Sequence, residues 1–566
     1  MYIIGIDVGG TNTDAALLYD SKVVALVKVA TNHQDLFSST RQALDEIMAH
    51  YEEEEPLTLQ LSTTLSTNAI VEGRGAPTEV VVVPGPGVNL ASLEFPFSVH
   101  ELSGYIDHRG REVSPLDGEQ IDRLREILGE GEGQAVAVVG KFSQRNPSQE
   151  QRIGSELAKW YHGIISYGHR LSGRSNFPRR IITTYLNARV AQGQQDFVRI
   201  WKKVQSELEM DWQNATPVGE ILVLKADGGT MTLDDSSERP IETILSGPAA
   251  SIMGVQALSR CQQPNYLIID IGGTTTDLAA VVDSEVLFER DGAIISGYKT
   301  LVPAVLTRSI GLGGDSALSF REDRGIVIGP QRAGVPTCLG GEHLTPTDAA
   351  VALDLAALGS KERAIAAWQR WARELGLNWD DLARQVVDAF TNQLSTAVQA
   401  FYDELERMPL YTVREILNPP EIRPGAVVGL GAPAPVFIPV LAQSLGLPHE
   451  VLPFSAGANA IGAAAAQATV GITLHADTEI GRVTIPELGY REEIHRPLFF
   501  DLAKARDLAE EKVREYAQNH GYDATGEIYI VDEESFQMVR GFRTVGQTHM
   551  VRTQLRPKVR KIEGGR

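Results

Sequence analysis

Two eight-residue segments share one arrangement of aspartate, glycine and threonine: DVGGTNTD at residues 7–14 and DIGGTTTD at residues 270–277. Paired glycines let backbone N–H groups approach an anion without obstruction by Cβ atoms, and neighbouring threonine hydroxyls add further donors. The aspartate before the glycines would repel a phosphate unless Mg²⁺ and its waters lay between them. The pattern therefore predicts two loops that together hold Mg-ATP.

The simpler interpretation is that each glycine segment is a tight hairpin turn, which would explain a single copy equally well. The sequence contains two near-identical copies, and each follows an apolar run and is bracketed by aspartates. This repetition favours phosphate binding over a purely structural turn.

The aspartates of the two loops have different expected roles. Asp7 and Asp270 precede the glycines and are the predicted Mg²⁺ ligands. Asp14 and Asp277 close the loops, and either could orient the attacking oxygen or accept its proton. We take Asp14, Asp270 and Asp277 as candidate catalytic residues. The predicted ATP contacts in the loops are Asp7, Gly9, Gly10, Thr11, Asn12, Thr13, Gly272, Gly273, Thr274 and Thr275.

A third glycine turn lies in the segment VVGLGAPAP, residues 427–435. There an expected strand meets Gly429, Gly431 and Ala432 before an expected helix, and these small residues would suit a flat purine. A glycine turn between strand and helix is common, but its position after the second phosphate loop favours contact with adenosine.

The elements that must position these residues are also duplicated. Residues 3–24 return in similar form as residues 267–287, and each copy reads as strand, Gly-Gly-Thr turn, second strand and third strand. A dinucleotide-binding glycine loop would instead open directly into a helix. Elsewhere short apolar strands alternate with long amphipathic stretches, which indicates an α/β class with two related halves facing each other.

Bulk composition limits the other functional classes. A chain of 566 residues is long enough for two or more domains with a cleft between them. The formal charge of −21 disfavours binding to nucleic acid or to a membrane surface. Two cysteines supply no disulfide framework, and no apolar run approaches the ~20 residues of a membrane span. We therefore expect a cytoplasmic protein.

Six further segments indicate which protein family the sequence resembles. They are STTLSTNAIVEGRG (62–75), GYIDHRGREVSPLD (104–117), KFSQRNPSQE (141–150), GHRLSGRSNFPRR (168–180), LKADGGTM (224–231) and ILSGPAAS (244–251). With the three glycine turns, they resemble the hydantoinase A and 5-oxoprolinase family of the actin, Hsp70 and sugar-kinase superfamily. The resemblance implies duplicated actin-like, ribonuclease H-like domains around a central nucleotide cleft.

The resemblance also suggests a division of the chain. We expect an N-terminal hydantoinase/oxoprolinase domain over residues 1–185 and a main ATPase domain over residues 186–475. Residues 476–566 would then form a C-terminal α/β extension.

The activity that the resemblance implies is ATP-dependent opening of a cyclic amide, such as a hydantoin or 5-oxoproline, through phosphorylation of the ring carbonyl. Related members carboxylate ketones, so an ATPase subunit of a carboxylase-type complex is one alternative. A non-catalytic ATP-driven conformational switch is another. The expected partners are a small carbonyl substrate, a second hydantoinase B-like subunit in the manner of some relatives, and a second copy of the chain.

Several residues outside the loops are candidate substrate contacts. His169, Arg170 and Arg174 follow an expected strand at 164–167 and could bind a carboxylate, or form a local polar loop. Asp315 stands where the family would have another glycine, and Ser316 follows it. Asp348 opens an expected helix, so it is either a helix cap or a contact to substrate or Mg²⁺. The candidate substrate residues are His169, Arg170, Arg174, Asp315, Ser316 and Asp348.

Overall fold

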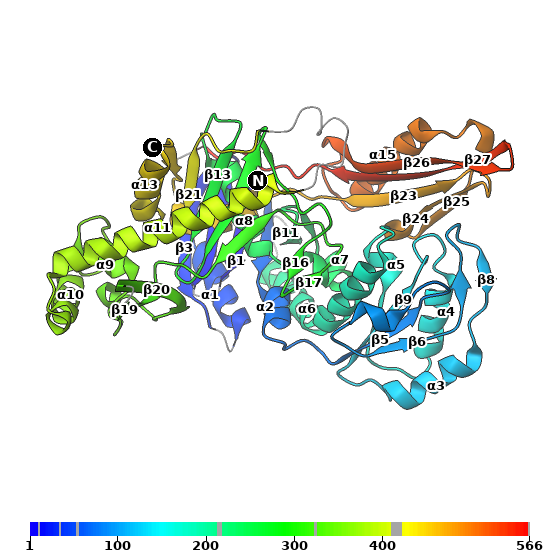
Figure 1. Cartoon of the computed structure of the whole chain (residues 1–566), viewed down its shortest axis with the longest axis horizontal. Coiled ribbons are helices and arrows are strands. Elements are labelled where there is room, and N and C mark those ends of the chain that lie inside the picture. The colour runs from blue at the N-terminus through cyan, green and yellow to red at the C-terminus, as the bar shows by residue number, and fades with distance from the viewer. Residues whose placement is uncertain are drawn as a thin grey trace.

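The computed structural model describes residues 1–9, 12–32, 35–52, 56–211, 218–321, 325–408 and 421–563 (Figure 1). It is a mixed α/β structure, which confirms the predicted class. Two mixed sheets form the centre, with a smaller parallel sheet and a C-terminal antiparallel sheet beside them.

The first sheet begins with the predicted meander. Strands β1, β2 and β3 are successive antiparallel neighbours, and β4 and β11 then extend the sheet parallel to β1. Every residue of β1 is buried, because one face packs on α1 (Leu36–Met48) and α6 (Phe177–Asp211) and the other on α8 (Ser246–Leu258) and α14 (Ala458–Ala465). The strands are β1 (Tyr2–Val8), β2 (Asn12–Tyr19), β3 (Lys22–Ala30), β4 (Leu57–Thr63), β11 (Val218–Leu224) and β12 (Thr230–Thr232).

The second sheet repeats this arrangement. Its β13 and β14 are antiparallel neighbours, and β21 and β22 lie parallel to β13 on the other side. The order β15-β14-β13-β21-β22 thus matches β3-β2-β1-β4-β11 of the first sheet. The strands are β13 (Tyr266–Ile271), β14 (Thr276–Val282), β15 (Glu285–Val286), β18 (Thr307–Ile310), β21 (Val427–Leu430) and β22 (His449–Val451).

Two helices rich in small residues, α8 (Ser246–Leu258) and α14 (Ala458–Ala465), join the sheets. One apolar core contains residues of both helices together with Ile3 of β1 and Ile268 of β13. A Cβ added to Gly5 would lie 2.1 Å from the Ala460 carbonyl oxygen. Glycine and alanine therefore allow α14 to lie directly on β1.

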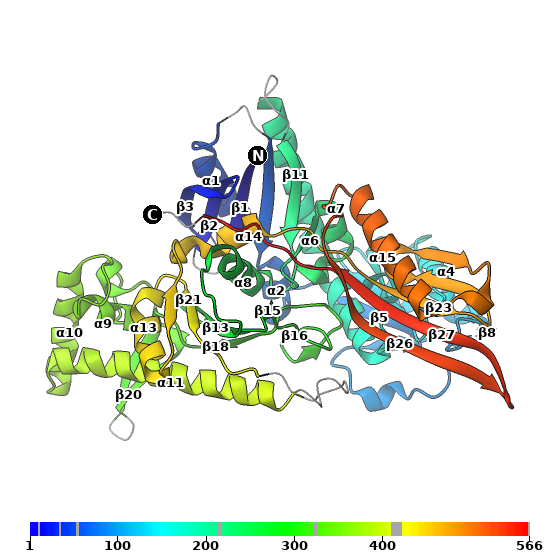
Figure 2. The same ribbon diagram turned by 90° about the horizontal axis from the view of Figure 1, so that it is seen from above.

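The remaining units lie at opposite ends of the molecule (Figure 2). The parallel sheet β10-β9-β5-β6 and the sheet β25-β24-β23-β27-β26 are at one end, and α10 and α11 are at the other. Their strands are β5 (Thr78–Val83), β6 (Val99–Glu101), β9 (Ala135–Gly140), β10 (Ile164–Tyr167), β23 (Gly471–Asp477), β24 (Arg482–Ile485), β25 (Tyr490–Glu493), β26 (Ile528–Arg540) and β27 (Arg543–Leu555).

The other strands form short pairs: β7 (Tyr105–Ile106) with β8 (Glu112–Ser114), β16 (Ile294–Ile295) with β17 (Tyr298–Lys299), and β19 (Ser316–Arg321) with β20 (Gly325–Arg332). The helices are α1 (Leu36–Met48), α2 (Leu65–Val71), α3 (Gly118–Leu128), α4 (Ser148–Leu157), α5 (Gly168–Leu171), α6 (Phe177–Asp211), α7 (Leu233–Glu238), α9 (Pro346–Ala352), α10 (Lys361–Leu375), α11 (Trp379–Glu406), α13 (Ala434–Leu445) and α15 (Leu502–Asn519).

Helix α6 spans the expected domain boundary at residue 185 and continues to the first sheet, which takes β11 and β12 from beyond that point. The division into three domains stays a prediction. Among the helices of the described ranges, none combines the length and the apolar character that crossing a bilayer requires.

Candidate active site

The first loop connects β1 to β2 and aligns its two aspartates. Asp7 and Asp14 are direct partners across the strands, and the Gly9 N–H donates to the Asn12 carbonyl oxygen over 3.0 Å. The Thr13 hydroxyl lies 3.1 Å from that of Thr31. Two of the predicted ATP contacts, Gly10 and Thr11, lie outside the described residues.

The second loop has the same closure. Asp270 is the cross-strand partner of Asp277, and the Gly272 N–H donates to the Thr275 carbonyl oxygen over 2.9 Å. The side chains of Thr274 and Thr275 are exposed, which leaves their hydroxyls available to a ligand. The predicted repetition therefore extends to the hydrogen bonding of the turns.

The four loop aspartates influence one another. Burial, with smaller contributions from Asp14 and Asp270, raises the pKa of Asp7 to about 7. Burial and then Asp270 raise the pKa of Asp277 to about 7 as well. Burial also raises the pKa values of Asp14 and Asp270. These couplings join aspartates of both loops, so the structure brings the two loops together in one acidic site.

Two residues of the joining helices reach this site. Asn459 of α14 is within hydrogen-bonding reach of both Asp7 and Asp270. The Ser251 hydroxyl of α8 lies 2.5 Å from Asp270 Oδ2 and 3.1 Å from Asn459 Oδ1. Sequence reasoning did not single out Ser251 or Asn459, although Ser251 lies in the family-like segment 244–251.

The two closing aspartates have different neighbours. Lys28 of β3 forms an ion pair with Asp14. The corresponding neighbour of Asp277 is Ser309 of β18, its cross-strand partner, and no cation pairs with Asp277 among the described residues. The duplicated positions are therefore chemically unequal, because a cation neutralises only one of them.

The donor set fits Mg²⁺, which prefers hard oxygen ligands and commonly binds through one or two carboxylates, waters and substrate phosphates. Asp7 is 5% exposed, and its Oδ1 has no hydrogen-bond partner in the described part of the chain. That unpartnered oxygen is available to ligate a cation. Within the same residues, no three acidic, histidine or cysteine side chains are arranged to hold a cation by themselves.

The predicted adenosine turn lies beside the second loop. In the parallel pairing of β13 and β21, Asp270 is opposite Leu430, so Gly431 follows at the edge of the site. Gly431 has φ +92°, and a Cβ there would lie 2.2 Å from the Ile271 carbonyl oxygen. A Cβ on Gly429 would meet Ile438 at 2.3 Å, whereas Ala432 is exposed.

The segment 311–316 supports the second loop, a role that sequence reasoning missed although GLGGDS is visibly glycine-rich. The Gly314 N–H donates to the Gly272 carbonyl oxygen over 3.0 Å, and the Asp315 N–H donates to that of Gly273 over 2.7 Å. The Asp315 carboxylate pairs with Arg332 at 2.9 Å. Buried Ser316 accepts from the Gly313 N–H. Asp315 and Ser316 thus lie against the phosphate loop.

Asp348 caps helix α9. Its two carboxylate oxygens accept from the N–H groups of Thr337 (3.0 Å), Cys338 (2.7 Å) and Thr345 (2.9 Å), and the side chain is fully buried. These bonds support the helix-cap interpretation, and a contact of Asp348 with substrate or Mg²⁺ stays a prediction.

His169 and Arg170 belong to α5 and Arg174 follows it, and α5 lies away from β1 and β13, which lead into the phosphate loops (Figure 1). Buried His169 contacts Glu150, the Arg170 guanidinium lies 5.4 Å from the centre of the Tyr167 ring, and Arg174 donates to the Asp291 carbonyl oxygen over 2.8 Å. The structure therefore does not join these residues to the site formed by the aspartates.

Two family models and several known proteins match this chain. A family model described as hydantoinase/oxoprolinase matches residues 180–471, and the model of the corresponding N-terminal region matches residues 3–160. The alpha subunit of caprolactamase from Pseudomonas jessenii is 27% identical over 397 residues, covering 63% of this chain and 55% of the relative. The gamma subunit of acetophenone carboxylase from Aromatoleum aromaticum is 28% identical over 398 residues, covering 62% and 53%.

A solved structure of the ATP-dependent caprolactamase from Pseudomonas jessenii has the same fold, with a TM-score of 0.71 at 20% identity over 99% of this chain and 88% of the other. In sequence, this chain spans only a little over half the length of the curated relatives that it matches.

Proposed function

Because this chain belongs to the hydantoinase/oxoprolinase family, we propose that it uses ATP to open a cyclic amide by phosphorylating the ring carbonyl oxygen. The observation that carries this proposal is the meeting of two glycine-threonine loops and four aspartates at one site. The names of the relatives support ATP use and a lactam substrate.

The chemistry explains the need for ATP. Amide resonance makes a lactam carbonyl a poor electrophile, and a bond from its oxygen to the γ-phosphorus removes that resonance. The backbone N–H groups of the two glycine turns, with Thr274 and Thr275, would bind the phosphates and orient this transfer. Asp7 and Asp270 would hold Mg²⁺, which supplies charge neutralisation on the phosphates.

Asp14 and Asp277, which have different neighbours, would have different roles in the reaction. Asp14, paired with Lys28, stays available as a charged group that orients the loop. Asp277 has no described cation partner, so it would accept a proton from the water that attacks the activated carbon. It would then return that proton to the ring nitrogen as the carbon–nitrogen bond breaks, which leaves an acyl phosphate. A second water would attack the acyl carbon and release phosphate, so that both oxygens of the new carboxylate come from water.

Carboxylation of a ketone is the second candidate activity, because one of the relatives is a carboxylase subunit. The shared chemistry would be phosphorylation of a carbonyl oxygen, with the enolate of a ketone in place of the amide. We further propose that this chain works with a second subunit, since relatives of both kinds carry subunit names.

The experiment is ATP turnover by the purified chain with Mg²⁺ and a panel of lactams, hydantoins, 5-oxoproline, and ketones with bicarbonate. We expect one class of cyclic amide to raise turnover and to yield ring-opened product, and the Asp270→Asn variant to lose both. Stimulation only by a ketone with bicarbonate would select the carboxylase alternative. Turnover that no compound alters, with or without candidate second subunits, would overturn both and favour a conformational switch.

A further inference from the structure

The long hairpin of β26 and β27 lies at one end of the molecule, and one of its strands is the edge of a sheet (Figure 2). In the order β25-β24-β23-β27-β26, β26 is the last strand, and its 13 residues pair with β27 on one side. Alternate residues of an edge strand direct their N–H and C=O groups away from the sheet. Among the described residues, no backbone group beyond β27 hydrogen-bonds to β26.

This edge lacks the features that usually prevent pairing with another chain. Natural edge strands are commonly short or contain lysine or proline, whereas β26 is long and contains neither. Its register shifts lie near its ends, so Asp532–Met538 is regular. Phe536 is 61% exposed, Val539 is 58% exposed, and Phe542 in the turn is fully exposed. The edge is therefore suited to pair with a further strand.

The two faces of β26 have different surroundings. Glu533 forms an ion pair with α15, which covers one face. Side chains alternate along a strand, so Asp532, Phe536 and Arg540 lie together on the opposite face. Asp532 is exposed and has no ion pair within the described part of the chain. Arg540 pairs with Glu479 at 2.8 Å, and 67% of its side chain stays exposed.

The charges on this face are complementary to themselves when the strand is reversed. A strand that pairs antiparallel with its own copy does so about a two-fold axis, so residue i opposite j requires j opposite i. A register centred on Glu533 or Glu534 would oppose carboxylates to carboxylates. A register centred on Phe536 opposes Asp532 to Arg540 of the second copy at both ends and brings the two Phe536 rings together at the axis.

We propose that the chain forms a two-fold symmetric dimer in which β26 pairs antiparallel with β26 of a second copy. The pairing joins two five-stranded sheets into one continuous sheet. Ion pairs between Asp532 and Arg540 set the register, and Phe536 and Val539 add apolar contact. A guanidinium has five N–H donors, so Arg540 can keep Glu479 while it binds Asp532 of the second copy.

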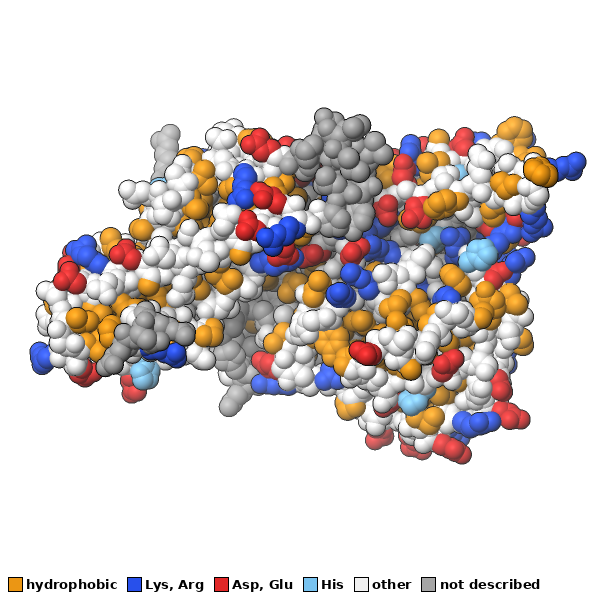
Figure 3. Space-filling model, in the orientation of Figure 1, with side chains coloured by type: hydrophobic (Ala, Val, Ile, Leu, Met, Phe, Trp, Pro, Cys, Tyr) orange, Lys and Arg blue, Asp and Glu red, His pale blue; other side chains and the backbone are white. Residues whose placement is uncertain are grey.

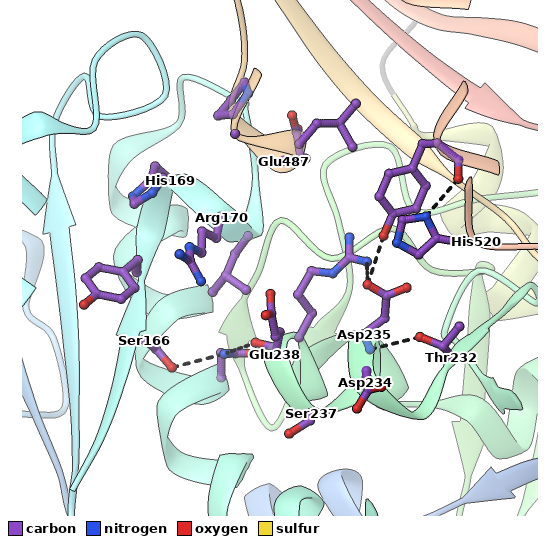
Figure 4. A pocket seen from close by; sticks show the side chains of 18 of the residues that line it. Ser166, His169, Arg170, Thr232, Asp234, Asp235, Ser237, Glu238, Glu487 and His520 are labelled. Atoms are coloured by element: carbon purple, nitrogen blue, oxygen red, sulfur yellow. Dashed lines mark hydrogen bonds and ion pairs between the residues drawn. The ribbon is translucent and has the colours of Figure 1, made fainter. Parts of the chain in front are cut away.

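The interface leaves the other sites of the molecule open. The phosphate loops follow β1 and β13, which lie away from the hairpin (Figure 2). A separate pocket has His169, Glu487 and His520 on its walls, and its described lining includes no residue of β26 (Figure 4). The dimer is therefore independent of the proposed function.

The test is the mass of the full chain in solution, measured by sedimentation velocity and light scattering over a range of concentrations. We expect twice the mass of one chain. Asp532→Arg and Arg540→Glu each oppose like charges at both ends of the pairing, so each should raise the dimer dissociation constant by about tenfold or more. Asp507→Arg reverses an exposed charge on α15, away from the edge, and should leave the dimer unchanged.

Mixing the two weakened variants tests the register itself. An equimolar mixture of Asp532→Arg and Arg540→Glu should form a heterodimer, because each end then opposes an arginine to a carboxylate. The double variant Asp532→Arg/Arg540→Glu should dimerise with itself for the same reason. Damage to the fold would not produce either recovery.

Three results would overturn the dimer: a single-chain mass for the unaltered chain at tens of micromolar, a dimer that both single variants retain, or variants that fold but do not recover in the mixture. Hydrogen exchange of the unaltered chain decides the matter even where a variant fails to fold. The outward amides of β26 should exchange more slowly as the dimer forms.

The exchange measurement also separates a second copy from a different partner. Protection of β26 only after addition of a candidate second subunit would assign the edge to that subunit and overturn pairing between copies. Asp270→Asn should lose ATP turnover and keep the dimer, so this inference and the proposed function can fail separately.

Discussion

At the scale of single residues, the duplication produces two aspartates in equivalent positions with different neighbours. Asp14 has an ion pair with Lys28, whereas Asp277 lies beside Ser309 and is raised in pKa to about 7 by burial and by Asp270. An acceptor of protons works best when its pKa is near the operating pH. This difference favours Asp277 over Asp14 as the proton acceptor in the proposed reaction.

Replacement of Asp277 by asparagine should therefore reduce kcat for amide-stimulated ATP turnover by about 10²–10⁴-fold, the usual contribution of a general base. The dissociation constant for Mg-ATP should change little, because Asp277 is not a predicted phosphate ligand. Steady-state rates and nucleotide titration measure the two quantities. Asp283→Asn, an exposed turn residue on the same sheet, is the matched control and should behave like the unaltered chain.

The raised pKa values also predict how stability depends on pH. The pKa values of Asp7 and Asp277 are about 7, against an ordinary 3.8, so the folded chain binds more protons than the unfolded chain between these values. Their stabilising contribution is complete below pH 4 and is lost as pH rises through 7.

Without Mg²⁺ or nucleotide, the free energy of unfolding should thus fall between pH 3.8 and 7, by up to about 1.4 kcal/mol per pH unit for each group. Urea titrations at several pH values measure the slope. Asp7→Asn and Asp277→Asn should each flatten it, and an unchanged slope in both variants would show that these carboxyls are not buried as described.

At the scale of elements, α14 packs closely on β1 because Gly5 has no side chain. Gly5→Val would place a Cβ about 2.1 Å from the Ala460 carbonyl oxygen, where backbone cannot yield. Large destabilisation and loss of nucleotide binding should follow, because α14 also carries Asn459. Thermal unfolding and nucleotide titration measure these effects.

Gly193→Ala is the control, because it changes a glycine that no neighbouring atom crowds. Gly193 is exposed on α6, and its nearest neighbour to an added Cβ is Leu65 at 3.8 Å. Alanine should stabilise the chain by about 0.5–1 kcal/mol, because it restricts the unfolded backbone. Equal unfolding midpoints for the Gly5 variant and the unaltered chain would contradict the described packing.

The sequence predicted those parts of the fold and site that depend on local pattern. The two meanders with their Gly-Gly-Thr turns, and the glycine turn at Gly431 after a strand, follow from spacing and repetition. Pairings between distant segments could not be read in this way. Lys28 beside Asp14, Asn459 between the loops, and Glu150 beneath His169 depend on how whole elements pack. Asp348 was ambiguous because a helix cap and a ligand use the same side chain.

At the scale of the whole molecule, the two central sheets meet through α8 and α14, so a nucleotide that contacts both loops would bind both halves. Acidic and basic side chains are intermingled over the face in Figure 3, so the net charge of −21 is not gathered into one patch there. The acidic side chains of the candidate active site are the four loop aspartates, of which Asp7 is buried and the other three are partly buried.

Mg-ATP should accordingly stabilise the whole chain. A ligand at 100 times its dissociation constant adds about 2.7 kcal/mol to the free energy of unfolding. Differential scanning fluorimetry should show a rise in Tm with Mg-ATP, little rise with ATP and a chelator, and none for Asp270→Asn. A rise that persists in this variant would place the nucleotide elsewhere.

The central claim is that the ring carbonyl oxygen attacks the γ-phosphate, and oxygen labelling tests it most directly. A cyclic amide that raises ATP turnover is supplied with ¹⁸O in its carbonyl, in unlabelled water, and the inorganic phosphate is analysed by mass spectrometry. Attack by the carbonyl oxygen, followed by attack of water on the acyl carbon, predicts one ¹⁸O per phosphate released and two water oxygens in the new carboxylate. Unlabelled phosphate, with ¹⁸O retained in the ring-opened acid, would show that water attacks ATP directly and would contradict the account.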